Sequence, residues 1–397
     1  MPSVSPTSTV QGSSRNIWRP FLLHLLLFAL LPGLLLLAGE VVLQTSGEVW
    51  PLPRVTAYQR AHPDSLFLRS VDQLFYAYKY RRILESRPSV LIAGSSRTMK
   101  FRAPMFGDRA NSFYNAGGIL NSLRDLHDFS VTLPSSVTPA VLLIGLDPWW
   151  FNERVAPAFS FADEISKGAG FSFDEHVMAL RWLFVNPQVL VHQAGLALRP
   201  DDNRAIGIAA RETGGGFRFD GSHQSRLATP RTEQEWAFVD RETPPVIERV
   251  RSGTGNFPPA TSLSRDRVAL LDEVLAAYQT RHVLVIGYLP PFSSEVLAQL
   301  ESDPRHRFFW ADFRREMPEL LARHGFPLFD ASATTAVGLD DRAMSDGFHA
   351  EETFQARVVR ALLDDERIRA ALPGTEAVLD RALASPRTNY WQPDFGR

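Results

Sequence analysis

Short apolar runs, each followed by small or polar residues, recur along the chain from residue 90 onward. The longer runs are Val90–Ala93, Ala140–Asp147, His282–Pro291 and Phe326–Asp330, and a further short strand is expected at Ser112–Asn115. Apolar residues at helical spacing occupy stretches between and beside them, at 72–85, 266–279 and 313–324. Buried strands that alternate with amphipathic helices predict an α/β domain with a mainly parallel sheet covered on both faces.

A different apolar pattern lies near the N-terminus. Residues 1–16 are rich in Ser, Thr, Pro and Gly and are predicted to be a disordered tail. The stretch Phe21–Gly39 then contains 19 residues without a formal charge. At about 1.5 Å per helical residue this length matches a bilayer core of about 30 Å. We therefore predict a transmembrane anchor over residues 17–43.

The charges that flank this anchor predict its orientation. Arg15 and Arg19 precede the apolar stretch, whereas Glu40 and Glu48 follow it. By the positive-inside rule the N-terminus lies in the cytoplasm and the rest of the chain lies across the membrane. A cleaved signal peptide is the alternative, but the run is longer than usual and no clear cleavage site follows.

The remaining chain divides at changes in composition. Residues 44–71 contain several prolines and are predicted to be a connector, and 72–372 form the main domain. Residues 151–260 break the strand and helix alternation and are predicted to be an insertion on the strand-end side. Its helical part is expected at Phe173–Phe184, and Arg211–Gln224 is a glycine-rich loop. Residues 373–397 form a C-terminal tail with a helical part.

The residues just after the strands carry the candidate chemistry, because ligands of parallel sheets bind at the carboxyl ends of strands. Ser95 and Ser96 follow the first strand. A serine becomes a nucleophile only with a base in reach, usually a histidine held by a carboxylate. Asp346 and His349 stand three residues apart on a loop before an amphipathic helix, so both side chains can face one cavity.

Each of these patterns alone is common, but their order along the chain is distinctive. The blocks Gly94-Ser95-Ser96, Asn115-Ala116-Gly117, Gly145-Leu146-Asp147 and Asp346-x-x-His349 follow one another. In this order the chain resembles the SGNH, or GDSL-like, hydrolase superfamily. More closely, it resembles membrane-anchored SGNH proteins associated with acylation of bacterial envelope polysaccharides or exopolysaccharides. The resemblance covers roughly residues 88–365.

The resemblance implies a fold and an activity. The fold is three-layer α/β/α, flavodoxin-like, with a mainly parallel sheet behind one N-terminal transmembrane helix. The implied activity is that of an extracytoplasmic serine esterase or O-acyltransferase on acyl esters of an envelope polysaccharide or glycolipid, with acetyl as the expected acyl group. Ser96 would be the nucleophile, His349 the base and Asp346 its orienting carboxylate. A multi-spanning membrane acyltransferase is the implied partner, and the compartment is the periplasmic side of the bacterial inner membrane.

The oxyanion donors are the weak point of this resemblance. The backbone N–H groups of Ser96 and Gly117 are the expected donors, with Asn115 as a further one. Asp147 stands where the family has an asparagine, and an ionised carboxylate cannot donate a hydrogen bond. Either Asp147 is protonated, or it points elsewhere, for instance at Arg97, or the protein is a catalytically inactive scaffold or carbohydrate-binding subunit.

Arg97, Trp149 and Trp150 are the candidate substrate-binding residues. The tryptophans follow Asp147 and can form a cleft wall that stacks on sugar rings, or a packed turn after a buried strand. Arg97 can orient an anionic substrate group or pair with a nearby carboxylate. The sequence leaves both alternatives open.

Composition narrows the remaining classes of function. The formal net charge is −2 and no basic run is interleaved with aromatic residues, so nucleic acid is not an expected partner. Cysteine is absent, which excludes disulfides and thiolate metal sites. No metal-binding or phosphate-binding motif occurs, so neither a metal site nor a cofactor is predicted.

Overall fold

The computed structural model describes residues 18–71, 75–156, 160–166, 172–197, 204–225 and 243–396. The predicted disordered tail lies outside these ranges, as do residues 72–74 at the start of a predicted helix. The main sheet has five strands in the order β2-β1-β3-β6-β7, and all neighbouring pairs are parallel. Their bounds are Val90–Gly94 (β1), Phe113–Gly117 (β2), Val141–Gly145 (β3), Leu284–Leu289 (β6) and Leu328–Asp330 (β7).

This strand order confirms the predicted α/β class with a mainly parallel sheet. Counted along the chain, the five strands lie in the order 2-1-3-4-5, a common order of doubly wound sheets. The direction of winding reverses between β1 and β3, and in such sheets ligands bind at this switch point, beyond the carboxyl ends of the strands. The residues after β1 and β3 therefore lie where the sequence predicted the site.

Helices were predicted at 72–85, 266–279 and 313–324, after His349 and in the C-terminal tail, and the sheet domain has a helix at each of these places together with others that were not predicted. Their bounds are Phe75–Ser86 (α3), Leu123–Thr132 (α4), Phe161–Ser166 (α5), Thr243–Ser252 (α10), Arg265–Thr280 (α11), Ser294–Ser302 (α12), Arg307–Arg323 (α13), Glu352–Leu362 (α14), Glu366–Ala371 (α15) and Thr375–Ala384 (α16). Helix α13 starts six residues earlier than predicted, because Phe309 and Trp310 extend its buried face beyond Phe313.

Short 3-10 helices connect several of these elements. They are Ser96–Thr98 (η1), Ala103–Ser112 (η2), Ser135–Val137 (η3), Pro148–Phe151 (η4), Thr334–Val337 (η5) and Asp341–Ala343 (η6). Two of them, η1 and η4, follow β1 and β3 at the carboxyl edge of the sheet.

Both faces of the sheet are buried against helices, because successive strand residues point to opposite faces. On one face, Leu91 and Ala93 of β1 belong to a cluster that includes side chains of α3, α4, α11 and α13. On the other face, Val90 and Ile92 pack with side chains of η2, α14 and α16. The C-terminal residues contribute to this second cluster through Leu379 of α16.

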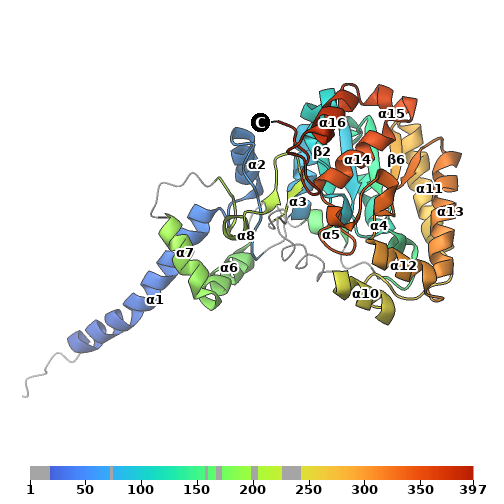
Figure 1. Cartoon of the computed structure of the whole chain (residues 1–397). Coiled ribbons are helices and arrows are strands. Elements are labelled where there is room, and N and C mark those ends of the chain that lie inside the picture. The colour runs from blue at the N-terminus through green and yellow to red at the C-terminus, as the bar shows by residue number, and fades with distance from the viewer. Residues whose placement is uncertain are drawn as a thin grey trace, which may run out of the picture.

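A second lobe, which contains the N-terminal helix α1, lies beside the sheet domain (Figure 1). Helix α1, Trp18–Ser46, is long and apolar enough to cross a membrane and includes Pro32 without a break. Against its C-terminal part pack α6, Phe173–Val185, and α7, Pro187–Ala197. Helices α6 and α7 of the insertion thus contact α1 rather than the sheet.

The segments between the two lobes are also folded. The predicted connector contains α2, Leu52–Ala61, whose Gln59 accepts a hydrogen bond of 2.5 Å from Tyr78 of α3. The predicted glycine-rich loop instead contains the end of α8, Ile208–Thr213, and an antiparallel pair, β4 (Gly216–Phe217) and β5 (His223–Gln224). The backbone N–H of His223 donates to Met99, so this pair lies beside η1.

Candidate active site

Ser96 lies at the carboxyl end of β1, on the first residue of η1. Ser95 caps this short helix, because its hydroxyl accepts the backbone N–H of Arg97 at 3.3 Å. Gly94 has a φ of +152°, and a Cβ there would lie 2.8 Å from Thr98 Cγ2, so the tight turn into η1 requires glycine. The turn leaves Ser96 half-buried at the surface of the domain.

Asp346 and His349 approach Ser96 from the loop between η6 and α14. The Asp346 Oδ1 accepts the backbone N–H groups of Phe348 and His349, both at 2.8 Å. Its Oδ2 lies 2.7 Å from His349 Nδ1, and His349 Nε2 lies 2.8 Å from Ser96 Oγ. The three side chains predicted from widely separated motifs therefore form a continuous hydrogen-bonded chain.

The electrostatics of Asp346 determine which nitrogen of His349 carries the proton. Burial alone would raise the pKa of Asp346. The hydrogen bond and charge of His349 and the two backbone donors outweigh burial and hold the pKa below its usual value. An ionised Asp346 only accepts, so His349 Nδ1 must donate and Nε2 is left to accept the Ser96 proton.

The predicted oxyanion donors are arranged differently from the expectation. The Gly117 N–H donates to Asn115 Oδ1 at 2.6 Å, and Asn115 Nδ2 donates to the carbonyls of Thr98 and Phe101. These groups hold β2 against η1, so their N–H groups are not available to bind the oxyanion of an intermediate. Of the three predicted oxyanion donors, only the Ser96 N–H makes no hydrogen bond to another group in the described part of the chain, so it alone is free to bind an oxyanion.

Asp147 follows the second of the alternatives that the sequence left open, because it points at Arg97. The Arg97 guanidinium donates to Asp147 Oδ1 at 2.8 Å, and the side chains are 1% and 0% exposed. Arg97 also donates to the carbonyls of Phe348, Pro290 and Pro291. Burial raises the pKa of the Asp147 carboxyl, while the Arg97 charge acts in the opposite direction.

Arg97 therefore joins three segments around the candidate nucleophile. It lies next to Ser96 in η1, and its partners follow β3, follow β6 and precede His349. A guanidinium buried in this way is not available to a substrate anion. The prediction of Arg97 as a substrate-binding residue is wrong, and its structural alternative is correct.

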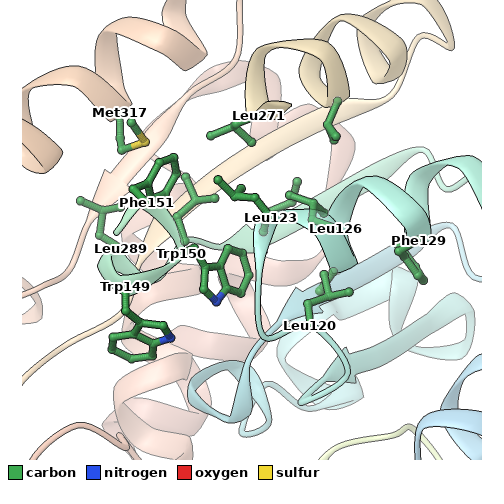
Figure 2. Close-up of a cluster of buried hydrophobic side chains, with 14 of the residues drawn as sticks. Leu120, Leu123, Leu126, Phe129, Trp149, Trp150, Phe151, Leu271, Leu289 and Met317 are labelled. Atoms are coloured by element: carbon green, nitrogen blue, oxygen red, sulfur yellow. The ribbon is translucent and has the colours of Figure 1, made fainter. Parts of the chain in front are cut away.

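Trp149 and Trp150 do not form an exposed cleft wall. They are 6% and 1% exposed and belong to the larger core cluster, as Figure 2 shows with Phe151, Leu123 and Met317. Trp149 also packs edge-on against Phe348, beside His349. The alternative of a packed turn after a buried strand is the correct one, because η4 turns this segment back into the core.

Lys79 of α3 was not among the residues predicted for the site. This side chain is fully buried, and its ammonium group donates a hydrogen bond to the carbonyl of Gly117. Burial lowers the pKa of Lys79 to about 7. The available signal was a lysine placed between Tyr78 and Ile83 in a helix whose other buried residues, apart from Arg82, are apolar or aromatic.

An apolar pocket of about 270 Å³ opens next to η1. Met99, whose backbone N–H donates to the Ser96 carbonyl, forms one wall. The other lining residues come from the segment before α3, from α3 itself and from the β4–β5 pair: Phe67, Leu68, Arg69, Ser70, Val71, Phe75, Phe217 and His223. In the described ranges no group of three His, Asp or Glu side chains is arranged as metal ligands would be.

The arrangement can perform nucleophilic acyl chemistry, since it supplies a hydroxyl, a base in contact with it and a carboxylate that orients the base.

Comparisons with known protein families, with characterised proteins and with solved structures found no match to this chain.

Proposed function

We propose that this protein is a membrane-anchored serine esterase or O-acyltransferase that acts outside the cytoplasm through an acyl-enzyme on Ser96. The observation that carries the proposal is the hydrogen-bonded chain from Ser96 to His349 to Asp346, with distances of 2.8 and 2.7 Å. A serine with no role in catalysis has no need of a histidine whose tautomer is set by a partly buried carboxylate.

The proposed reaction has two stages. Ser96 Oγ attacks the carbonyl carbon of an acyl ester while His349 Nε2 takes the hydroxyl proton. The tetrahedral intermediate collapses, the C–O bond to the leaving alcohol breaks, and His349 returns the proton to that oxygen. Water or a sugar hydroxyl then attacks the acyl-enzyme, with His349 again as the base, and releases Ser96. Water gives deacylation, and a sugar hydroxyl gives acyl transfer.

The order of motifs supports a position in the SGNH superfamily, with a flavodoxin-like three-layer fold. Helix α1 supports attachment to the bacterial inner membrane, and the flanking charges support a periplasmic sheet domain. A protein held there meets envelope polysaccharides and glycolipids, so we propose one of these as substrate. A multi-spanning acyltransferase would then supply acyl groups across the membrane. The apolar pocket beside Met99 suits an acyl group or a lipid-linked donor.

The oxyanion region favours a second candidate function. Gly117 and Asn115 donate within the protein, and Asp147 is paired with Arg97. Loss of one oxyanion donor lowers the rate of a serine hydrolase by about two to three orders of magnitude. A protein with this arrangement could serve as a scaffold or carbohydrate-binding subunit of a polysaccharide-modification complex, without catalysis of its own.

Labelling with a fluorophosphonate distinguishes the two candidates, because this probe phosphonylates only an activated serine. The full-length chain in detergent micelles should be labelled, as should Ser95→Ala, whereas Ser96→Ala should not. Ser95 is the matched control, since it neighbours Ser96 but bonds to Arg97 N–H. A folded wild-type protein that takes up no probe would reject the enzyme and favour the non-catalytic subunit.

A further inference from the structure

The two helices of the insertion that pack on α1 form a hairpin of their own. Helices α6 and α7 are joined at Asn186 and Pro187 and lie beside the C-terminal part of α1 (Figure 1). Their buried side chains pack with Val42 and Leu43 of α1 in a separate cluster that contains Ala179, Leu183 and Leu190. The hairpin is therefore attached to α1 along one side, and its other side is uncovered.

The exposed surface of this hairpin is rich in apolar side chains, beside the exposed Asp174, Arg181, Gln188 and His192. Outside α1, the described residues include eight large apolar side chains that are exposed, and six of them lie on the hairpin: Phe173, Val177, Met178, Phe184, Val185 and Val191. Val185 and Val191 are each 72% exposed. Arg181 is the single charged residue between 177 and 191. A soluble surface rarely concentrates its exposed apolar side chains in one place, so this face has an apolar partner.

The position of the hairpin along α1 identifies that partner as the lipid bilayer. A Cβ at Gly39, the last residue of the charge-free stretch, would lie 3.0 Å from Leu180 and 3.3 Å from Phe184. His176 Nε2 lies 2.6 Å from Glu40, the first charged residue after that stretch. The exposed apolar side chains of the hairpin therefore lie beside the end of the apolar stretch of α1. At this level the hydrocarbon core of a bilayer meets its headgroups.

The dimensions and hydrogen bonds of the hairpin fit this boundary. Helices of 13 and 11 residues are too short to cross a bilayer, which needs about 20, but they suit an interfacial element. The turn satisfies its polar groups internally, since Asn186 donates from its side chain to Trp182 O at 2.8 Å and from its backbone to Leu183 O at 3.1 Å. A backbone at the edge of the hydrocarbon core must satisfy its hydrogen bonds internally, as this turn does.

We propose that the α6–α7 hairpin inserts its exposed apolar face into the outer headgroup and acyl boundary of the membrane. With α1 it forms a two-point attachment that restricts rotation of the sheet domain about the anchor. This inference rests on the membrane anchoring by α1 proposed above, and not on the chemistry at Ser96. A protein partner on the same face is the competing outcome.

The absence of cysteine allows a direct test in the full-length protein. Single variants Val185→Cys, Val131→Cys and Leu35→Cys are labelled with an NBD fluorophore and reconstituted in vesicles of phosphatidylcholine and phosphatidylglycerol, three to one. Val131 is the matched control, because it is a valine of the sheet domain that is 66% exposed. Leu35 lies within α1 and reports the anchor itself. Lipids spin-labelled near the headgroup then quench any fluorophore that contacts the bilayer.

We expect the Val185 and Leu35 labels to shift their emission to the blue and lose at least half of their intensity to spin-labelled lipid. The Val131 label should do neither. Quenching at Leu35 but not at Val185 would overturn the hairpin proposal and leave the anchor intact. No quenching at Leu35 would overturn both. A blue shift at Val185 without quenching by lipid would indicate a protein contact and also overturn it. Fluorophosphonate labelling of the same vesicles reports on Ser96 separately.

Discussion

Asp346 is the residue on which the candidate triad depends, because it holds both the loop and the imidazole. Its Oδ1 accepts two backbone N–H groups and its Oδ2 accepts His349 Nδ1. Asp346→Asn keeps the Oδ1 contacts but presents an amide donor to Nδ1. His349 then adopts the other tautomer, and its Nε2–H can no longer accept the serine proton. Fluorophosphonate labelling should slow by roughly three to four orders of magnitude.

The stability of Asp346→Asn is the control for this prediction. The melting temperature should change little, since the loop retains its backbone contacts. An unfolded variant would need replacement by Asp346→Glu before any conclusion about chemistry. Labelling at the wild-type rate in a folded Asp346→Asn protein would refute the assignment of Asp346.

Asp147 is the residue whose role differs most from that expected of its motif position. Replacing Asp147 by asparagine restores the asparagine that the SGNH superfamily has in this block. The substitution also leaves Arg97 buried without its counter-charge. Removal of one partner from a buried ion pair costs about 3 to 5 kcal/mol. Asp147→Asn should therefore lower the melting temperature by roughly 5 °C or more, as measured by thermal unfolding of the full chain in detergent.

An exposed ion pair provides the comparison for Asp147→Asn. Glu316 lies 2.7 Å from Arg265, whose side chain is 65% exposed. Pairs of this kind contribute at most about 1 kcal/mol. Glu316→Gln should melt close to the wild type. Equal destabilisation by the two variants would contradict a special role for the buried pair.

Among the helices, α3 carries a charge into the core beside β2. Lys79 has its pKa lowered to about 7 by burial, whereas in the unfolded chain it takes its usual value near 10.5. Between these values the unfolded state binds more protons than the folded state, so the free energy of unfolding rises with pH. The slope from this group approaches about 1.4 kcal/mol per pH unit between pH 7 and 10.

Lys79→Met tests this contribution, because it keeps an unbranched apolar chain without the terminal amine. The difference in free energy of unfolding between variant and wild type, obtained from urea titrations at pH 7, 8 and 9, should shift steadily in favour of the wild type. A difference that stays constant with pH would show that Lys79 does not change its protonation on unfolding.

At the scale of the whole molecule, the proposed location of the sheet domain outside the cytoplasm depends on the orientation of α1. Arg15 and Arg19 precede the apolar stretch, and Glu40 and Glu48 follow it. Alkaline phosphatase, which needs an oxidising compartment to form its disulfides, should be active when fused after Arg397 in bacterial cells. A fluorescent protein that matures only in the cytoplasm should be dark at the same position. The reverse pattern would refute the orientation.

The alternation of apolar runs and amphipathic stretches was sufficient to predict the class of the fold. In the main sheet, strand positions were correct to within a few residues, since β1, β3 and β6 are almost wholly buried and read as continuous apolar runs. In the insertion the pattern predicted a helix at Phe173–Phe184, which α6 confirms, but it did not predict α7, nor α2 in the segment 47–71. Helices α2 and α7 bury only narrow faces, against α3 and α1 respectively, so their local sequence carries a weak signal.

The sequence by itself determined the apolar α1 and the parallel sheet class, because a charge-free helix and buried strands encode their geometry within a few residues. The Ser96, His349 and Asp346 side chains were identified from the order of motifs along the chain and its resemblance to the SGNH superfamily. Only the tertiary structure decided that Asp147 pairs with Arg97, that Gly117 donates to Asn115 and that Trp149 and Trp150 are buried. Those partners come from segments that are adjacent only after the chain has folded, and a side chain's orientation depends on what packs against it.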